Sequence, residues 1–177
     1  MREQDLSRFK LPPGFRGRPA WFVQLWWLVD NLLFRPSPQF AYGYRARLLR
    51  LFGARIGTNT VIRPTVRITY PWKICVGDHS WLGDEVTLYS LGEISIGDHS
   101  VVSQKSYLCA ADHDHRKPDF PIRAKPISIG SRVWLAADVF VGPGVSIGDG
   151  TVVGARSTVL RDIEAESFAA GYPARIY

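Results

Sequence analysis

Aliphatic residues recur at every sixth position over the C-terminal third of the chain. The run comprises Ile129, Leu135, Val141, Ile147, Val153 and Val159, and the same spacing continues to Ala165 and Gly171. Gly or Ala follows five of the six aliphatic residues, and a small or β-branched side chain comes four residues after each of the first five. A period of six matches neither an α-helix nor a simple alternating strand. It predicts a solenoid in which each hexad supplies one short strand and one corner.

The same period begins at Ile56 and passes through two interruptions of two residues each. The inward positions that it predicts before the C-terminal run are Ile56, Ile62, Ile68, Ile74, Val76, Leu82, Leu88, Ile96, Val102 and Leu108. The register moves by two at 74–76 and again between Leu88 and Ile96. If three hexads complete one turn, about five coils stack, and a strand spacing of ~4.8 Å gives a prism on the order of 25 Å tall.

The segment 110–126 interrupts the repeat and has no periodicity of its own. It is seventeen residues long and contains two of the four histidines, His113 and His115. An aperiodic segment of this length inside a compact domain is more often functional than idle. We therefore expect a loop that is ejected from the solenoid and carries part of a functional site.

The first 55 residues lack the repeat and are expected to form an arm and two amphipathic helices. Residues 1–19 are rich in Pro, Gly and Arg, which predicts an extended arm without its own core. One helix is predicted from Pro19 to about Phe34, where two prolines end it, and a second from about Gln39 to Phe52, with Gly53 as its C-terminal cap. The domain boundaries are thus 1–55 for the helical segment and 56–177 for the solenoid.

Composition narrows the range of functions only modestly. The chain has 177 residues, 46% of them hydrophobic, and a net charge of +6, which suits an anionic ligand, a membrane surface or nucleic acid. No nucleic-acid-binding module is recognisable, so we expect no nucleic acid partner. The two cysteines follow no metal or disulfide pattern, and the start of the chain is not a secretory signal, which favours the cytoplasm. The most apolar stretch, 21–34, is too short and too polar to span a bilayer.

Several motifs carry a resemblance to a known family. The hexads, the ejected loop that rejoins the repeat at 125–135, and the segments 143–148 and 171–175 resemble the hexapeptide-repeat acyltransferases. The segments 11–17 and 103–109 are similar to the branch that acts in colanic acid biosynthesis. The resemblance implies a mainly β, left-handed parallel β-helix. It also implies a homotrimer with active sites between subunits, and an acetyl-CoA-dependent O-acetyltransferase that modifies a sugar hydroxyl in exopolysaccharide biosynthesis, with no metal.

Such a transfer needs a base that removes the proton of the attacking hydroxyl. The resemblance places the catalytic histidine of the family on His113. Histidine, with an unperturbed pKa of about 6.5, suits this task, and a positioned base contributes roughly 10²–10⁴-fold. Asp112 and Asp114 are candidates for orienting the ring, and His115 is the rival base.

Family positions also point to residues for the two substrates. The candidates for coenzyme A are Trp134, Ala137, Ala155, Leu160, Arg161 and Arg175. Sugar acetyltransferases that act on galactosides or maltose carry an Asn and an Asp for the acceptor, but this chain has Gly83 and Leu91 there. The acceptor site must therefore be built differently, and the nearby candidates are Asp84, Glu85 and Ser90.

Three alternatives stay open at the level of the sequence. A zinc-dependent, carbonic-anhydrase-like hydrase would need His79 or His99 to join His113 and His115, although stacked corner residues are the simpler explanation of the repeated Gly-Asp-His-Ser. A non-catalytic binding scaffold is the second. The third concerns the Trp-rich helix, which could cover the open first coil, the reading we favour, or rest on the inner leaflet as a peripheral membrane contact.

Overall fold

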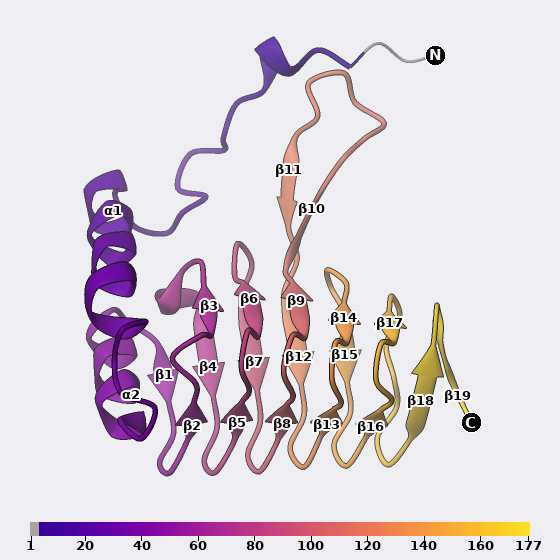
Figure 1. Cartoon of the computed structure of the whole chain (residues 1–177). Coiled ribbons are helices and arrows are strands. Elements are labelled where there is room, and N and C mark those ends of the chain that lie inside the picture. Colours follow the sequence, from indigo (N-terminus) through magenta and orange to yellow (C-terminus); the bar gives the residue numbers. More distant parts are fainter. Residues whose placement is uncertain (1–3) are drawn as a thin grey trace.

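A computed structural model describes residues 4–177 and shows a three-walled parallel β-solenoid with two helices across one end (Figure 1). The N-terminal segment contains η1 (Leu6–Arg8), α1 (Ala20–Val29), the π-helical turn η2 (Asp30–Phe34) and α2 (Tyr42–Leu51). Residues 1–3 of the predicted arm lie outside the described residues. Both predicted helices are present, and Gly53, at φ 90°, follows the second.

The second helix begins at Tyr42, not near Gln39 as predicted. The guanidinium of Arg45, which is fully buried, donates to the carbonyl oxygens of Pro38 and Gln39 at 2.8 and 2.6 Å. It also donates to the carbonyl of Ile62 in the first coil at 2.6 Å. These bonds hold residues 38–41 as a turn against the solenoid, so the helix starts only after them.

Each wall of the solenoid is one sheet of short parallel strands. Sheet A contains β1 (Arg55–Ile56), β4 (Ile74–Val76), β7 (Ile94–Ile96), β12 (Ile127–Ile129) and β15 (Ser146–Ile147). Sheet B contains β2 (Val61–Ile62), β5 (Trp81–Leu82), β8 (Val101–Val102), β13 (Trp134–Leu135), β16 (Val152–Val153), β18 (Phe168–Gly171) and the antiparallel β19 (Ala174–Ile176). Sheet C contains β3 (Arg67–Ile68), β6 (Thr87–Tyr89), β9 (Tyr107–Cys109), β14 (Phe140–Val141) and β17 (Thr158–Val159), and the turn η3 (Pro71–Lys73) follows β3.

The strand register confirms the predicted repeat and both of its interruptions. Ile56 pairs with Val76, which pairs with Ile96, so the first coils are twenty residues long and contain the two extra residues at each slip. Ile129 pairs with Ile147 eighteen residues later, as three uninterrupted hexads require. All the predicted inward aliphatic residues from Ile56 to Val159 are buried, and they line one continuous core.

The predicted register is wrong in the last coil. Ala165 and Gly171 are exposed, and Ile163 and Ala169 are buried in their place. Ile163 bridges to Ile147, and Ala169 pairs with Val153. The corner that follows β17 is two residues shorter than a hexad allows, so the last turn closes early and the inward positions move back by two.

The corners between sheets A and B need a residue in the left-handed backbone region. His79 and His99 occupy it, at φ 57° and 55°, a conformation that is uncommon outside Gly, Asn, Asp and His. The carboxylate of Asp98 accepts a hydrogen bond from the backbone N–H of Asp78 in the coil before it, at 2.7 Å. The repeated Gly-Asp-His-Ser therefore builds the corner and ties neighbouring coils together.

Candidate active site

The segment ejected from the solenoid is a β-hairpin. Its strands, β10 (Ala111–His113) and β11 (Ile122–Ala124), are antiparallel, with Ala111 opposite Ala124 and His113 opposite Ile122. The hairpin leaves after β9 and returns before β12, so it projects from the corner between sheets C and A (Figure 1). Sequence reasoning predicted the ejection but not the strand pairing.

His113 lies at the end of β10, half-buried, with one ring nitrogen engaged. Its Nδ1 is 2.8 Å from the carbonyl oxygen of Phe120, and the two rings stack at 4.2 Å between centroids and 8° between planes. Because a carbonyl oxygen only accepts, Nδ1 donates the proton of this bond and Nε2 is the basic nitrogen. Phe120 is at φ 45°, in the left-handed region that aromatic residues rarely adopt. The turn of the hairpin thus fixes the tautomer in which Nε2 can accept a proton.

The N-terminal arm lies against the same hairpin. The backbone N–H of Asp5 donates to the carbonyl of Pro118 at 2.8 Å, and the ring of Phe9 lies 6.0 Å from the ring of His113 at an angle of 51°. The side chain of Phe9 therefore covers part of the imidazole. The arm has no buried residues in its η1 turn, as expected for a segment without its own core.

The carboxylates of Asp112 and Asp114, the candidates for orienting the ring of His113, contact cationic side chains of the hairpin. Arg123 donates to both carboxylate oxygens of Asp112, at 2.7 and 3.0 Å, and Lys125 donates to Oδ2 at 3.1 Å. Asp114 lies 3.8 Å from Arg123. Burial alone would raise the pKa of Asp112, but the bonds with Arg123 and Lys125 outweigh that effect and hold the pKa below its usual value. These carboxylates fasten the two strands of the hairpin to each other.

His115, the rival base, is exposed on the hairpin. Its backbone N–H donates to the carbonyl of His113 at 3.1 Å, which keeps the two residues in one tight turn. Of the two rings, that of His113 is held in place by the carbonyl oxygen of Phe120.

The residues predicted to hold coenzyme A lie in three separate places. Ala137 and Ala155 stack at the corner between sheets B and C, where the N–H of Arg156 donates to the carbonyl of Ala137 at 2.9 Å. Trp134 is exposed on the adjoining sheet B, and its indole N–H donates to Ser103 at 3.0 Å. Leu160 and Arg161 follow β17 at the corner between sheets C and A, two coils beyond β9 and the hairpin, and Arg175 lies on β19.

Two of the three acceptor candidates share a cleft, and the third does not. Asp84 and Glu85 line a cleft of about 640 Å³ together with the exposed indole of Trp81. Arg63 lines the same cleft and lies 3.5 Å from the carboxylate of Asp84. Ser90 is fully buried, and its hydroxyl bonds to both the N–H and the carbonyl of Tyr70, at 2.8 and 3.1 Å. Ser90 is therefore a structural residue of the second coil and not a substrate contact.

Comparison with known proteins identifies the family. The family model "Bacterial transferase hexapeptide (six repeats)" matches residues 126–161. The protein named "Putative colanic acid biosynthesis acetyltransferase WcaF" of Escherichia coli (strain K12) is 61% identical over 171 residues, which cover 97% of this chain and 94% of that protein. The chain belongs to the hexapeptide-repeat acetyltransferase family.

Solved members of the hexapeptide-repeat acetyltransferases have the same architecture. A galactoside acetyltransferase in complex with coenzyme A superposes with a TM-score of 0.82 at 27% identity, covering 95% of this chain and 83% of that one. A hexapeptide-repeat acetyltransferase from Vibrio cholerae O1 biovar eltor, in complex with acetyl coenzyme A, gives a TM-score of 0.76 at 28% identity, covering 92% and 85%.

Sequence reasoning missed four residues around the imidazole of this hexapeptide-repeat acetyltransferase. They are Phe9, Phe120, Arg123 and Lys125. In the sequence, Arg123 and Lys125 alternate with Ala124 and Pro126. This alternation is typical of a strand with both charged side chains on one face, and that face lies opposite Asp112. The role of Phe120 had no signal in the sequence, because its backbone carbonyl makes the contact.

The histidines at the corners stay away from the hairpin within one chain. His79 and His99 stack at 4.9 Å with 6° between their planes, which confirms the predicted stacking of corner residues. They lie at the corner between sheets A and B, whereas His113 projects from the corner between sheets C and A. Over residues 4–177, no group of three His, Cys, Asp or Glu side chains is placed to hold a metal ion.

Proposed function

We propose that this chain is an acetyl-CoA-dependent O-acetyltransferase that modifies a sugar hydroxyl of an exopolysaccharide precursor of the colanic acid type. The 61% identity to the colanic acid biosynthesis acetyltransferase supports the pathway. Two relatives of the same architecture that contain coenzyme A or acetyl coenzyme A support the co-substrate. The observation that carries the chemistry is the bond from Nδ1 of His113 to the carbonyl of Phe120, which leaves Nε2 as a base.

The proposed mechanism uses this base in one direct transfer. Nε2 of His113 removes the proton of the acceptor hydroxyl while its oxygen attacks the thioester carbonyl. The carbonyl of Phe120, still accepting from Nδ1, stabilises the imidazolium that forms. Collapse of the tetrahedral intermediate forms the sugar ester and breaks the carbon–sulfur bond, and the imidazolium returns its proton to the leaving thiolate.

We place the complete site between neighbouring subunits of a homotrimer. The hairpin with His113 and the corner with Ala137 and Ala155 are on different edges of one prism. A neighbouring chain packed alongside would bring the second edge to the first, with the coenzyme between them. Arg161 and Arg175 are then candidates for its phosphates, because guanidinium groups bind phosphate bidentately.

The acceptor sugar is proposed to bind in the cleft that Trp81, Asp84 and Glu85 line. An exposed indole offers a flat apolar surface for a sugar ring, and carboxylates accept hydrogen bonds from its hydroxyls. We expect the enzyme to act in the cytoplasm, at the inner face of the membrane, because precursors of exported polysaccharides carried on a lipid would be presented there.

The test is a pair of histidine variants assayed for acetyl transfer from acetyl-CoA to saccharide acceptors. His113→Ala should lower turnover by roughly 10²–10⁴-fold, the contribution of a positioned base, whereas His115→Ala should stay near the wild-type rate. Both variants should keep the wild-type melting temperature and its rise with added acetyl-CoA. Near-normal turnover of His113→Ala, or a melting temperature of the wild type that acetyl-CoA does not change, would overturn the proposal.

A further inference from the structure

The first helix has two apolar faces, and only one of them is covered. Its inward residues, Val23, Trp26, Asp30 and Phe34, are buried against the first coil. A second stripe has the same helical spacing and consists of Trp21, Leu25, Leu28 and Leu32, which are 66%, 41%, 56% and 62% exposed. Since each residue advances an α-helix by 100°, this stripe lies roughly opposite the buried one. The favoured reading of the Trp-rich helix as a cover of the first coil therefore explains only half of its apolar residues.

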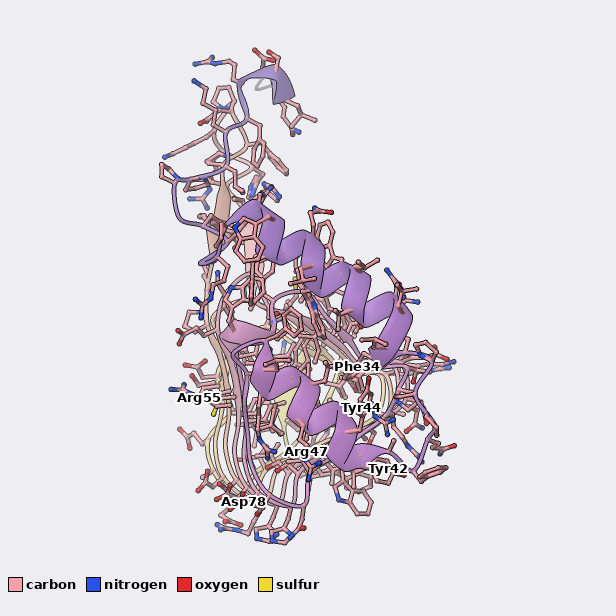
Figure 2. All side chains as sticks on the ribbon, turned by 90° about the vertical axis from the view of Figure 1, so that its left-hand side faces the viewer. Phe34, Tyr42, Tyr44, Arg47, Arg55 and Asp78 are labelled. Atoms are coloured by element: carbon pink, nitrogen blue, oxygen red, sulfur yellow. The ribbon has the colours of Figure 1, made fainter. Side chains whose placement is uncertain are left out.

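The neighbouring elements extend the exposed apolar surface. Five further large apolar residues of these elements are exposed: Trp27 on α1, Leu33 on η2, Phe40 before α2, and Tyr44 and Leu51 on α2. Figure 2 looks onto this end of the molecule and shows the two helices lying across the solenoid, with Tyr44 and Arg47 on the outer side of α2. We call the exposed residues of α1, η2, Phe40 and α2 the end face. Apolar surface of this extent marks a binding surface in a soluble protein.

The net positive charge of the chain is concentrated in the same segment. Residues 16–57 contain seven arginines and one acidic residue, Asp30, so their formal charge of +6 equals that of the whole chain. Asp30 is buried and paired with Arg35 at 2.7 Å, and of the seven arginines only Arg45 is buried. The exposed charges that the segment 16–57 itself carries are therefore all positive.

We propose that the end face docks on the anionic surface of a phospholipid membrane. Leucine side chains and amphipathic indoles would enter the interface, while the arginines would bind the lipid headgroups. No helix within residues 4–177 is long and apolar enough to cross a bilayer. The helices would thus lie in the plane of the membrane surface.

Docking through the end face would set the orientation of the solenoid relative to the membrane. The helices cross one end of the solenoid, so the coils would stack away from the membrane and the hairpin would project alongside it (Figure 1). The hairpin follows β9 and precedes β12, two to three strand spacings of ~4.8 Å beyond the first coil. The helix layer adds about 10 Å, so the hairpin base lies roughly 20 Å from the outer side of the helices. On the proposed function, this height suits a saccharide that stays attached to a lipid carrier.

A second copy of the chain fits the end face less well. A self-complementary contact would bring two sets of exposed arginines together, and the one carboxylate of the segment is already buried and paired. An anionic lipid surface supplies the negative charge that this contact lacks.

The experiment is sedimentation of the full-length protein with phosphatidylcholine vesicles that contain or lack phosphatidylglycerol. We expect at least tenfold stronger partition onto the anionic vesicles, lost at high salt. Leu28→Glu should weaken it about tenfold or more, whereas Ile176→Glu, at a site of similar exposure (54%) at the other end of the solenoid, should leave it unchanged. Arg47→Gln should weaken it severalfold, and Arg132→Gln, on a corner of the fourth coil, should not.

The results that would contradict the membrane docking differ from those that would contradict the proposed function. Equal partition onto both vesicle types, no partition, or a Leu28→Glu variant that partitions like the wild type would overturn the docking. A change in oligomeric state of Leu28→Glu in vesicle-free buffer would also overturn it and place a second copy on the end face. Acetyl transfer to a soluble saccharide, measured on the same samples, separates the two proposals. Vesicle binding without transfer sinks the proposed function alone, and transfer without vesicle binding sinks the docking alone.

Discussion

At the scale of single residues, the hairpin divides its polar groups into two tasks. The imidazole of His113 is held by a backbone carbonyl, and the carboxylate of Asp112 is held by Arg123 and Lys125. An aspartate that is bound to two cations is a poor partner for a histidine that must accept a proton and return it. The carbonyl of Phe120 carries no charge that could trap the imidazolium.

Asp112→Asn should loosen the hairpin in a pH-dependent way. The folded state holds the pKa of Asp112 below its usual value. The stabilisation is therefore fully present above the unfolded pKa of about 3.9 and is lost as the pH falls through the lower folded pKa. Because the pair is partly exposed, we expect about two- to fivefold less protection of the amides of 111–124 at pH 7.

Hydrogen exchange of the wild type and Asp112→Asn at matched pH measures this difference. The two proteins should converge only when the pH falls below the folded pKa of Asp112. A difference that is equally large at pH 7 and at pH 2 would show that the carboxylate is not what fastens the strands.

At the scale of elements, the six-residue period predicted the core well because each hexad buries one aliphatic side chain in a narrow interior. It placed the inward residues from Ile56 to Val159 and both slips. The period failed to predict that Ile163 is an inward residue. The corner before Ile163 is two residues shorter than in the other hexads, and the residue types do not reveal this change of spacing. The hairpin was predicted only as a loop, since three-residue strands such as β10 are too short to show a periodicity.

The partners of the imidazole were the least predictable feature of the candidate site. Motif position pointed to His113, but nothing in the residue pattern favoured the carbonyl of Phe120 over two adjacent carboxylates as its partner. That choice depends on a left-handed backbone angle at Phe120, which no side chain encodes. The handedness of the solenoid likewise came from the family resemblance and not from the period.

Leu135→Ala tests the core at this scale. Leu135 is fully buried in sheet B, between Val102 and Val153, and truncation should leave a cavity that costs about 2–5 kcal/mol in the free energy of unfolding. Leu160→Ala removes the same atoms from a side chain that is 57% exposed and should cost less than about 1 kcal/mol. Urea denaturation of both variants measures the difference, and equal costs would contradict the assignment of Leu135 to the interior.

At the scale of the whole molecule, the candidate residues fall on different edges of one prism. The hairpin base, Leu160 and Arg161 lie at the corner between sheets C and A, whereas Ala137 and Ala155 lie at the corner between sheets B and C. A solenoid with a packed interior is too rigid to bring these edges together by bending. If both groups act on one acetyl-CoA, the second must come from another chain.

Mixed oligomers test whether the site is shared. His113→Ala removes the base, and Ala155→Trp should block the opposite edge, where Ala155 is exposed, so each variant alone should be inactive. When equal amounts of the two chains assemble at random, a site that takes its hairpin from one chain and its corner from the next has both halves intact in about one case in four. Sequential affinity purification of co-expressed, differently tagged chains removes the homotrimers, and each mixed trimer then has one intact site of three. The purified sample should therefore recover about a third of the wild-type turnover. If the site lay within one chain, every site would carry one of the two defects, and the mixed oligomers would stay as inactive as either parent.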